Sequence, residues 1–289
     1  YKSYLKCVII IRKRQILGVS CMSGLRSVTL GTSDLSKTNK LFKDILGLNV
    51  ASKNQALRFG DADLSPGTRI HFVEVPNPEY ENQHIASVGL RTPTDSGLDE
   101  YQTILKENQI QASDVTELNG NKHFNFEDSN HQIFDIYSNE HNTGVGLGTP
   151  TFDSTVNPLH QIQGLGPIII KVNELPVTAS ILKNVFNLTH YAEYESTEFP
   201  EQVIQVFQIG EGGLGGELHL YQPNEPIELK EKGIVEQIEF NANSVEAFNN
   251  AKKELDDIGI PYQTLNQGDA QSLRITENSG ISFIYTLEK

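Results

Sequence analysis

Histidine is the residue type of this chain best suited to proton transfer, because its side chain titrates near neutral pH. His71 lies in the alternating segment RIHFVEV and shares its parity with Val73, so we expect it on the pocket side of a strand. A lone strand histidine is more often hydrogen-bonded structure than a general base, and both roles stay open for His71. His84, His123 and His131 stand at predicted strand or turn ends, where solvated side chains are expected.

Other patterns that would indicate catalysis or nucleotide binding are weak or missing. The sequence has no GxSxG motif, no zinc-type spacing and no cysteine after Cys21. GEGGLGG at 210–216 formally contains GxGxxG, but the predicted strand ELHLYQ follows it where a phosphate-binding helix would have to begin. We therefore interpret 210–216 as a flexible hairpin loop beside a pocket, placed to act as a lid.

Composition narrows the class of partner. The formal net charge is -14, whereas binding to nucleic acids or anionic membranes requires clustered Lys and Arg.

Residues 1–21 differ from the rest, since they hold five basic residues, no acidic residue and both cysteines, Cys7 and Cys21. We interpret 1–21 as a non-native or mis-set leader, with Met22 as the natural start. The cysteine-free remainder predicts a cytoplasmic protein without disulfides.

Four segments repeat one order of elements, namely an apolar strand, a capped helix and two or three further strands. In the first segment Ser33 is the predicted N-cap of the helix, and Gly47 is its predicted left-handed cap. The four helical faces are predicted to open at Leu35, Leu98, Leu175 and Val245, with gaps of 63, 77 and 70 residues. One duplicated βαβββ unit with loop insertions would give this spacing.

A single βαβββ unit leaves an open sheet edge and a half-buried face, so the units must associate in pairs. Residues 140–163 are rich in Gly, Thr and Pro and form the predicted linker. The predicted organisation is therefore a leader at 1–21, units one and two at 22–139, the linker at 140–163, and units three and four at 164–289.

These repeats carry a family resemblance. GLRSVTL recurs as GLGPIII, FEDSNHQIFDIY forms a hairpin, and GDADLSPGTRIHFVEVP is similar to a first-unit hairpin of one group of enzymes. From Met22 to the C-terminus the chain resembles the vicinal oxygen chelate superfamily of glyoxalases and extradiol dioxygenases, and within it the bacterial ring-cleaving dioxygenases of hydroquinone-type substrates. The resemblance implies an α+β fold whose four modules form paired, curved, mixed sheets.

The resemblance also implies a non-haem iron site with two histidines and one glutamate. Its three ligand positions correspond to Ser27, Gln237 and Ile284 in this chain. None of these residues is an ordinary iron ligand. No cofactor is therefore expected, and a divalent metal such as Fe or Mn is expected only if the ligands have moved.

Strand alternation supports this assignment of the implied ligand positions to residues of the chain. The residues predicted to pack beneath the helices are Val28, Leu30, Ile238 and Phe240. The residues predicted to face the pocket of units one and four are Ser27, Thr29, Gln237 and Glu239, together with His71.

Units two and three offer a second pocket. Its equivalent ligand positions are Ser87, Asp135, Pro167 and His219, and the predicted neighbours on the same face are Arg91, Tyr137, Lys171 and Tyr221. Asp135 and His219 with waters could hold a weak divalent ion, or they could form an internal hydrogen-bonded pair. The cations and phenols could hold an anionic or aromatic small molecule, or they could be ordinary rim residues.

Three hypotheses follow. The first is a binding protein or pseudoenzyme that has lost the iron triad and holds a small aromatic or quinone-like molecule. The second is an active metal-dependent glyoxalase or ring-cleaving dioxygenase with relocated ligands. The third is a structural protein that binds a partner through its acidic surface. A small molecule is the expected partner, nucleic acid and membrane are not, and a homodimer is left open.

Overall fold

The computed structural model describes residues 24–53, 56–60, 69–75, 84–151, 153–196, 202–228 and 235–288. The predicted leader at 1–21 lies outside the described residues. Among the described residues, no helix is both long and apolar enough to cross a membrane.

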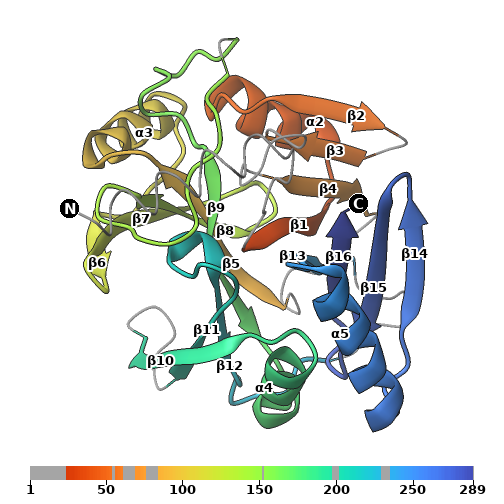
Figure 1. Ribbon diagram of the computed structural model, residues 1–289. Coiled ribbons are helices and arrows are strands. Elements are labelled where there is room, and N and C mark those ends of the chain that lie inside the picture. Colours follow the sequence, from red (N-terminus) through yellow and green to blue (C-terminus); the bar gives the residue numbers. More distant parts are fainter. Residues whose placement is uncertain are drawn as a thin grey trace, which may run out of the picture.

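The four predicted units are present in chain order (Figure 1). Unit one consists of β1 (Leu25–Thr32), α2 (Leu35–Asn39), the π-helix η1 (Lys40–Ile45), β2 (Val50–Lys53), β3 (Ala56–Phe59) and β4 (Ile70–Glu74). Unit two consists of β5 (Ile85–Thr92), α3 (Asp95–Glu107), β6 (Thr116–Leu118), β7 (Asn121–Glu127) and β8 (Ile133–Ser138). Unit three consists of β9 (Gly164–Lys171), α4 (Leu175–Asn184), β10 (Thr189–Glu195), β11 (Val203–Gln208), the 3-10 turn η3 (Leu214–Gly216) and β12 (Glu217–Tyr221). Unit four consists of β13 (Gln237–Asn241), α5 (Val245–Ile258), β14 (Gln263–Gln267), β15 (Ala270–Thr276) and β16 (Ser282–Glu288).

The units pair across the sequence into two mixed eight-stranded sheets. Sheet A joins units one and four in the order β14-β15-β16-β13-β1-β4-β3-β2. Sheet B joins units two and three in the order β10-β11-β12-β9-β5-β8-β7-β6. In each sheet the two first strands of the units pair antiparallel at the centre, β1 with β13 and β5 with β9. The predicted fold class, α+β with paired mixed sheets of βαβββ modules, is confirmed.

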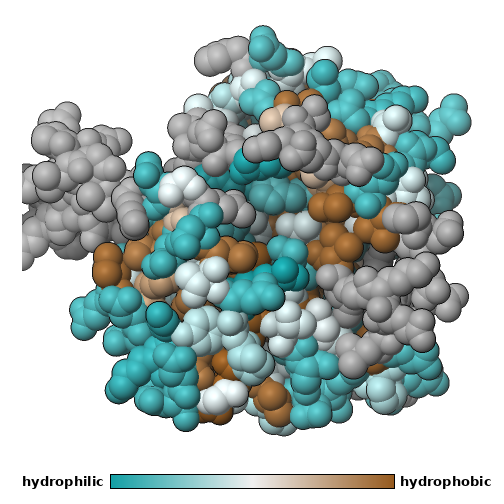
Figure 2. All heavy atoms as spheres, turned by 90° about the vertical axis from the view of Figure 1, so that its right-hand side faces the viewer, coloured by the Kyte–Doolittle hydropathy of each residue, from teal (hydrophilic) through white to brown (hydrophobic). Residues whose placement is uncertain are grey.

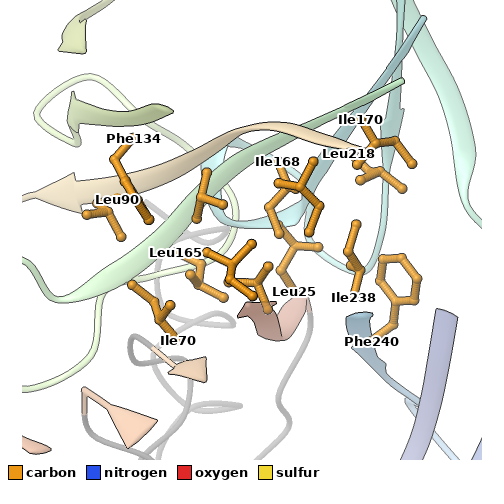
Figure 3. Packing of buried hydrophobic residues seen from close by; sticks show 14 of the residues in the cluster. Leu25, Ile70, Leu90, Phe134, Leu165, Ile168, Ile170, Leu218, Ile238 and Phe240 are labelled. Atoms are coloured by element: carbon orange, nitrogen blue, oxygen red, sulfur yellow. The ribbon is translucent and has the colours of Figure 1, made fainter. Parts of the chain in front are cut away.

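Both sheets share one hydrophobic core. Figure 3 shows side chains of sheet A, such as Leu25 and Ile238, close to Leu165 and Ile168 of sheet B. Phe42 of η1 contacts both sheets, since its ring centroid lies 4.9 Å from that of Phe72 and 5.1 Å from that of Phe134. Side chains of both sheets and of the helices therefore belong to one cluster, and a smaller cluster of Ile169, Ile204 and Tyr221 lies on sheet B.

Two details of the helices differ from the predictions. Asp34, not Ser33, caps α2, because its carboxylate accepts hydrogen bonds from the backbone N–H of Ser36 and Lys37, whereas the Ser33 hydroxyl donates to Asn130 Oδ1 at 3.2 Å. Gly47 does adopt the predicted left-handed conformation, with a φ of 75°.

Val245 was wrongly placed on the buried face of the fourth helix. It is the first residue of α5 and is 61% exposed. The buried stripe of α5 begins one turn later and consists of Phe248, Ala251 and Leu255, whose spacing of three and four residues keeps them on one face. Figure 2 shows the side of the molecule nearest β14 and β15, where hydrophilic residues predominate and hydrophobic ones are visible between them.

The segment 140–163 between β8 and β9 packs against the body of the protein. Val145, Val156 and Ile162 in it are buried. The Val145 N–H donates to Gly212 O at 2.9 Å, and the Asn142 side chain accepts from the Leu214 N–H at 2.9 Å.

The glycine-rich loop 210–216 packs against the segment 140–163. Leu214, Gly215 and Gly216 are buried, and Gly213 has a φ of 67° and a ψ of -175°, a conformation that is nearly exclusive to glycine. A Cβ at Gly213 would overlap the Thr143 carbonyl oxygen. The predicted hairpin loop is present, since it joins the antiparallel strands β11 and β12, but its glycines serve close backbone packing and do not favour a flexible lid.

Gly213→Ala should lower the free energy of unfolding by at least about 3 kcal/mol, because it adds a steric overlap to a backbone conformation that alanine rarely adopts. Gly259→Ala is the matched control, since Gly259 also has a positive φ of 73° but a Cβ there would meet nothing within 4 Å. The control should lose about 1 kcal/mol. Urea unfolding of the two variants measures both values, and equal losses would contradict the packing role of the loop.

Candidate functional site

The face of sheet A that points away from the core carries the predicted site residues of units one and four. Cross-strand neighbours there are Ser27 with Glu239, and Thr29 with both Gln237 and His71. The residues that alternate with them, Val28, Leu30, Ile238 and Phe240, are at most 2% exposed. We call the outward set Arg26, Ser27, Thr29, His71, Gln237, Glu239, Arg274, Ser282, Ile284 and Thr286 the polar face of sheet A.

Glu239 lies at the centre of this face and has both carboxylate oxygens engaged. Ser27 Oγ donates to Oε2 at 2.6 Å. Thr286 Oγ1 donates to Oε1 at 2.5 Å, and Arg26 Nε lies 3.0 Å from the same oxygen. The Arg26 guanidinium also donates to Asn241 Oδ1 at 3.0 Å and contacts the Glu288 carboxylate. A cation of the protein therefore already neutralises this carboxylate.

Arg26 reaches Glu239 because of an irregularity in β1. Leu25 pairs with Phe240 and Ser27 with the preceding residue, Glu239, so β1 contains one extra residue at Arg26. Such a bulge breaks the alternation and re-aims a side chain. Strict alternation from Ser27 would put Arg26 on the core face with Val28, so the sequence pattern gives no signal for this contact.

The residues at the three positions of the implied iron triad do not fit that metal. Ser27 uses its hydroxyl hydrogen on Glu239. Gln237 carries an amide, and Ile284, which lies opposite Glu239 on β16, carries an alkyl group. Among the described residues there is no group of three or more His, Cys, Asp or Glu side chains placed to hold a metal ion. The chemistry that these side chains offer is hydrogen bonding and ion pairing.

His71 is neutral at physiological pH. Arg58 Nε donates to His71 Nε2 at 3.3 Å, so the remaining ring proton resides on Nδ1. Burial, followed by the Arg58 guanidinium, lowers the pKa of His71 to about 4, against an opposing effect of Glu239. A group with so low a pKa is a weak general base, which favours the hydrogen-bonded structural role.

On sheet B, Asp135 belongs to a buried hydrogen-bonded network. Its carboxylate accepts from the Ser87 hydroxyl and lies 3.1 Å from His123 Nδ1. His123 Nε2 contacts Thr116 Oγ1 at 3.2 Å, and the His123 ring stacks on Tyr137 with centroids 4.7 Å apart. Sequence analysis had placed Ser87 in the same pocket as Asp135, but it had not joined His123 to either residue.

His219 has partners of its own. Tyr194 OH lies 3.0 Å from His219 Nδ1, and Glu217 Oε2 lies 3.1 Å from His219 Nε2. Neither contact involves Asp135, so the two candidate metal ligands have different hydrogen-bond partners. Interaction with His219 lowers the pKa of Glu217 against the opposing effect of its burial.

The other predicted neighbours on sheet B fall into two groups. Tyr221 and Lys171 are cross-strand partners, and burial raises the pKa of Tyr221 to about 12 and lowers that of Lys171. Arg91 is 1% exposed and donates to the carbonyl oxygens of Leu165, Val145 and Gly146. These contacts favour a structural role for Arg91 in holding the segment 140–163.

Two histidines were wrongly predicted to be solvated. His84 is fully buried, and its Nδ1 lies 3.0 Å from Glu236 Oε2. His123 is 7% exposed, because it packs in the network with Asp135 and Tyr137 described above. His84 precedes β5 and Glu236 precedes β13, so their contact joins the two sheets. No local sequence pattern predicts a contact between residues so far apart in the chain. His131 is exposed, as predicted.

The low pKa of His71 makes stability depend on pH. The unfolded chain binds a proton near pH 6.5 and the folded protein near pH 4, so the free energy of unfolding should fall as pH decreases from 6.5 to 4. NMR titration of the His71 ring should give a midpoint near 4, shifted upward in Arg58→Ala because a neighbouring cation is removed. Lys253→Ala, on the exposed face of α5, should leave the midpoint unchanged. A wild-type midpoint near 6.5 would contradict the assignment.

Comparison with known proteins shows similarity to a protein that is named as a ring-cleaving dioxygenase, MhqA of Bacillus subtilis (strain 168). The two are 29% identical over 237 residues, which cover 78% of this chain and 74% of MhqA. No family model matches the chain.

Solved structures agree on the fold. A structure described as a dioxygenase from Bacillus subtilis strain 168 superposes with a TM-score of 0.73 at 17% identity, covering 93% of this chain and 86% of that one. Glyoxalase I from Zea mays, in a variant form, superposes with a TM-score of 0.64 at 10% identity, covering 92% and 94%. We conclude that the chain has the fold of the vicinal oxygen chelate superfamily and that its sequence resembles the ring-cleaving dioxygenases of that superfamily.

Proposed function

We propose that this protein is a pseudoenzyme that binds a small aromatic or quinone-like molecule on the polar face of sheet A without a catalytic metal. One observation carries the proposal. At the implied iron-ligand position Ser27 donates a hydrogen bond to Glu239, whose charge Arg26 already neutralises. A divalent ion there would have to displace a guanidinium from a half-buried carboxylate, and none of the three implied ligand positions would offer it a histidine.

Two groups of this face are available to a ligand. Among the described residues, the Gln237 amide and the Thr29 hydroxyl have no side-chain hydrogen-bond partner, and the two residues are neighbours across β1 and β13. Ile284 adds a half-buried apolar contact on β16. Amide and hydroxyl groups beside an apolar side chain suit a molecule that presents ring hydroxyls or carbonyls on an apolar ring.

The proposal includes the cellular setting that the sequence predicts, a cytoplasmic protein, because residues 22–289 contain no cysteine. The name of MhqA supports the choice of aromatic ligands for the first binding tests. An active metalloenzyme with relocated ligands is the alternative that these tests must separate.

Metal analysis tests the loss of the iron site. Protein purified and then incubated with Fe²⁺ or Mn²⁺ under reducing conditions should retain substoichiometric metal after desalting, and Glu239→Gln should not change that value. His219→Ala is the companion variant, since His219 is the relocated ligand of the alternative. Stoichiometric metal that is lost in either variant would refute the proposal.

Ligand binding tests the face itself. Calorimetric titration with hydroquinone should give measurable binding, and Gln237→Leu should weaken it about tenfold, because a net hydrogen bond is worth about 1.4 kcal/mol. Gln205→Leu, on β11 of the other sheet, is the matched control and should bind like wild type. Equal affinities for all three proteins would place the ligand elsewhere.

A further inference from the structure

Arg274 extends the polar face of sheet A toward β15. It lies opposite Ile284 of β16 in the sheet register. Its Nε and Nη2 atoms both donate to Ser282 Oγ, each at 3.2 Å. Ser282 is itself the cross-strand partner of Gln237 on β13. The guanidinium therefore leans from β15 toward the middle of the face, where the free amide of Gln237 lies.

Arg274 and Arg26 differ in the groups that surround their positive charges. Arg26 contacts two carboxylates, those of Glu239 and Glu288. Among the described residues, Arg274 has no carboxylate within ion-pair distance, and the oxygen that it contacts belongs to a neutral hydroxyl. Two of its five N–H donors converge on that single oxygen, which leaves the Nη1 edge of the guanidinium for another acceptor.

The surroundings of Arg274 also differ from those of Arg91. In the part of the chain that the structure describes, Arg91 has no carboxylate partner either, but it is buried and donates to backbone carbonyl oxygens. Arg274 is half-buried on a sheet face of a protein that has a formal net charge of -14. Planar guanidinium groups bind carboxylates through two parallel hydrogen bonds, a geometry that an isolated Lys cannot provide.

We propose that the ligand of the polar face is an aromatic acid whose carboxylate binds Arg274. The inference rests on the proposed function and narrows it to one chemical class. The ring would lie against Ile284, and a ring hydroxyl would bind the Gln237 amide. The protein cation at Arg274 would then attract ligand oxygens by ion pairing. The acidic surface would disfavour anions generally, so the preference depends on this local cation.

The test compares three related probes, namely 2,5-dihydroxybenzoate, its uncharged amide 2,5-dihydroxybenzamide, and hydroquinone. By calorimetry, wild type should bind the acid at least about tenfold more tightly than the amide, as expected for a charge-assisted pair. Arg274→Gln should abolish this preference and leave amide binding within about twofold of wild type. Arg274→Lys should retain only part of it, since it keeps the charge without the fork.

Lys253→Gln is the matched control, because it removes one positive charge on the exposed face of α5 and should leave the preference intact. Equal binding of acid and amide by wild type, or a preference that survives Arg274→Gln, would overturn the inference and leave the proposed function standing. Absence of binding by all three probes would refute both. If Arg274→Gln fails to fold, as judged by circular dichroism, the wild-type comparison and Arg274→Lys still decide the outcome.

Discussion

The polar face of sheet A depends on the neutralisation of one carboxylate, Glu239. A half-buried carboxylate is costly unless cations and hydrogen-bond donors surround it. Arg26, Ser27 and Thr286 supply those donors from β1 and β16, so Glu239 ties the two strands that flank β13 to one another. The same contacts occupy the position for which the family resemblance implies a metal ion. The Ser27 hydroxyl, an inadequate metal ligand, is well suited to this role.

The scaffold around the face is held by contacts that recur from unit to unit. In the β7–β8 hairpin, Asp128 binds the turn and Asn130 bonds to Thr32 of unit one. In the β15–β16 hairpin, Glu277 binds the Ser279 N–H of its own turn and accepts from Thr178 of unit three. Each hairpin thus anchors to the neighbouring unit on the other sheet. Together with the His84–Glu236 contact, these bonds fix the two sheets about their shared core.

The two sheets show how one unit can carry different polar chemistry. Position 135 of unit two and position 284 of unit four are equivalent in the repeat, and they hold Asp and Ile respectively. On sheet B the carboxylate of Asp135 is satisfied by Ser87 and His123. On sheet A the alkyl group of Ile284 forms no hydrogen bond, and Arg274 lies opposite it in the register. The acidic residue of unit two therefore has no counterpart at the equivalent position of unit four.

The sequence by itself determined the repeat, the alternation and the fold class. Apolar periodicity is a local property of the sequence, and the spacing of Leu35, Leu98 and Leu175 can be counted along it. Both can therefore be recognised without the structure. The alternation also placed Ser27, Gln237 and Glu239 on one face correctly. Only the tertiary structure decided which side chains neutralise one another. The bulge at Arg26 and the burial of His84 against Glu236 each arise from contacts between segments that are distant in the chain. Such pairings depend on the register of the folded sheets, which no local pattern encodes.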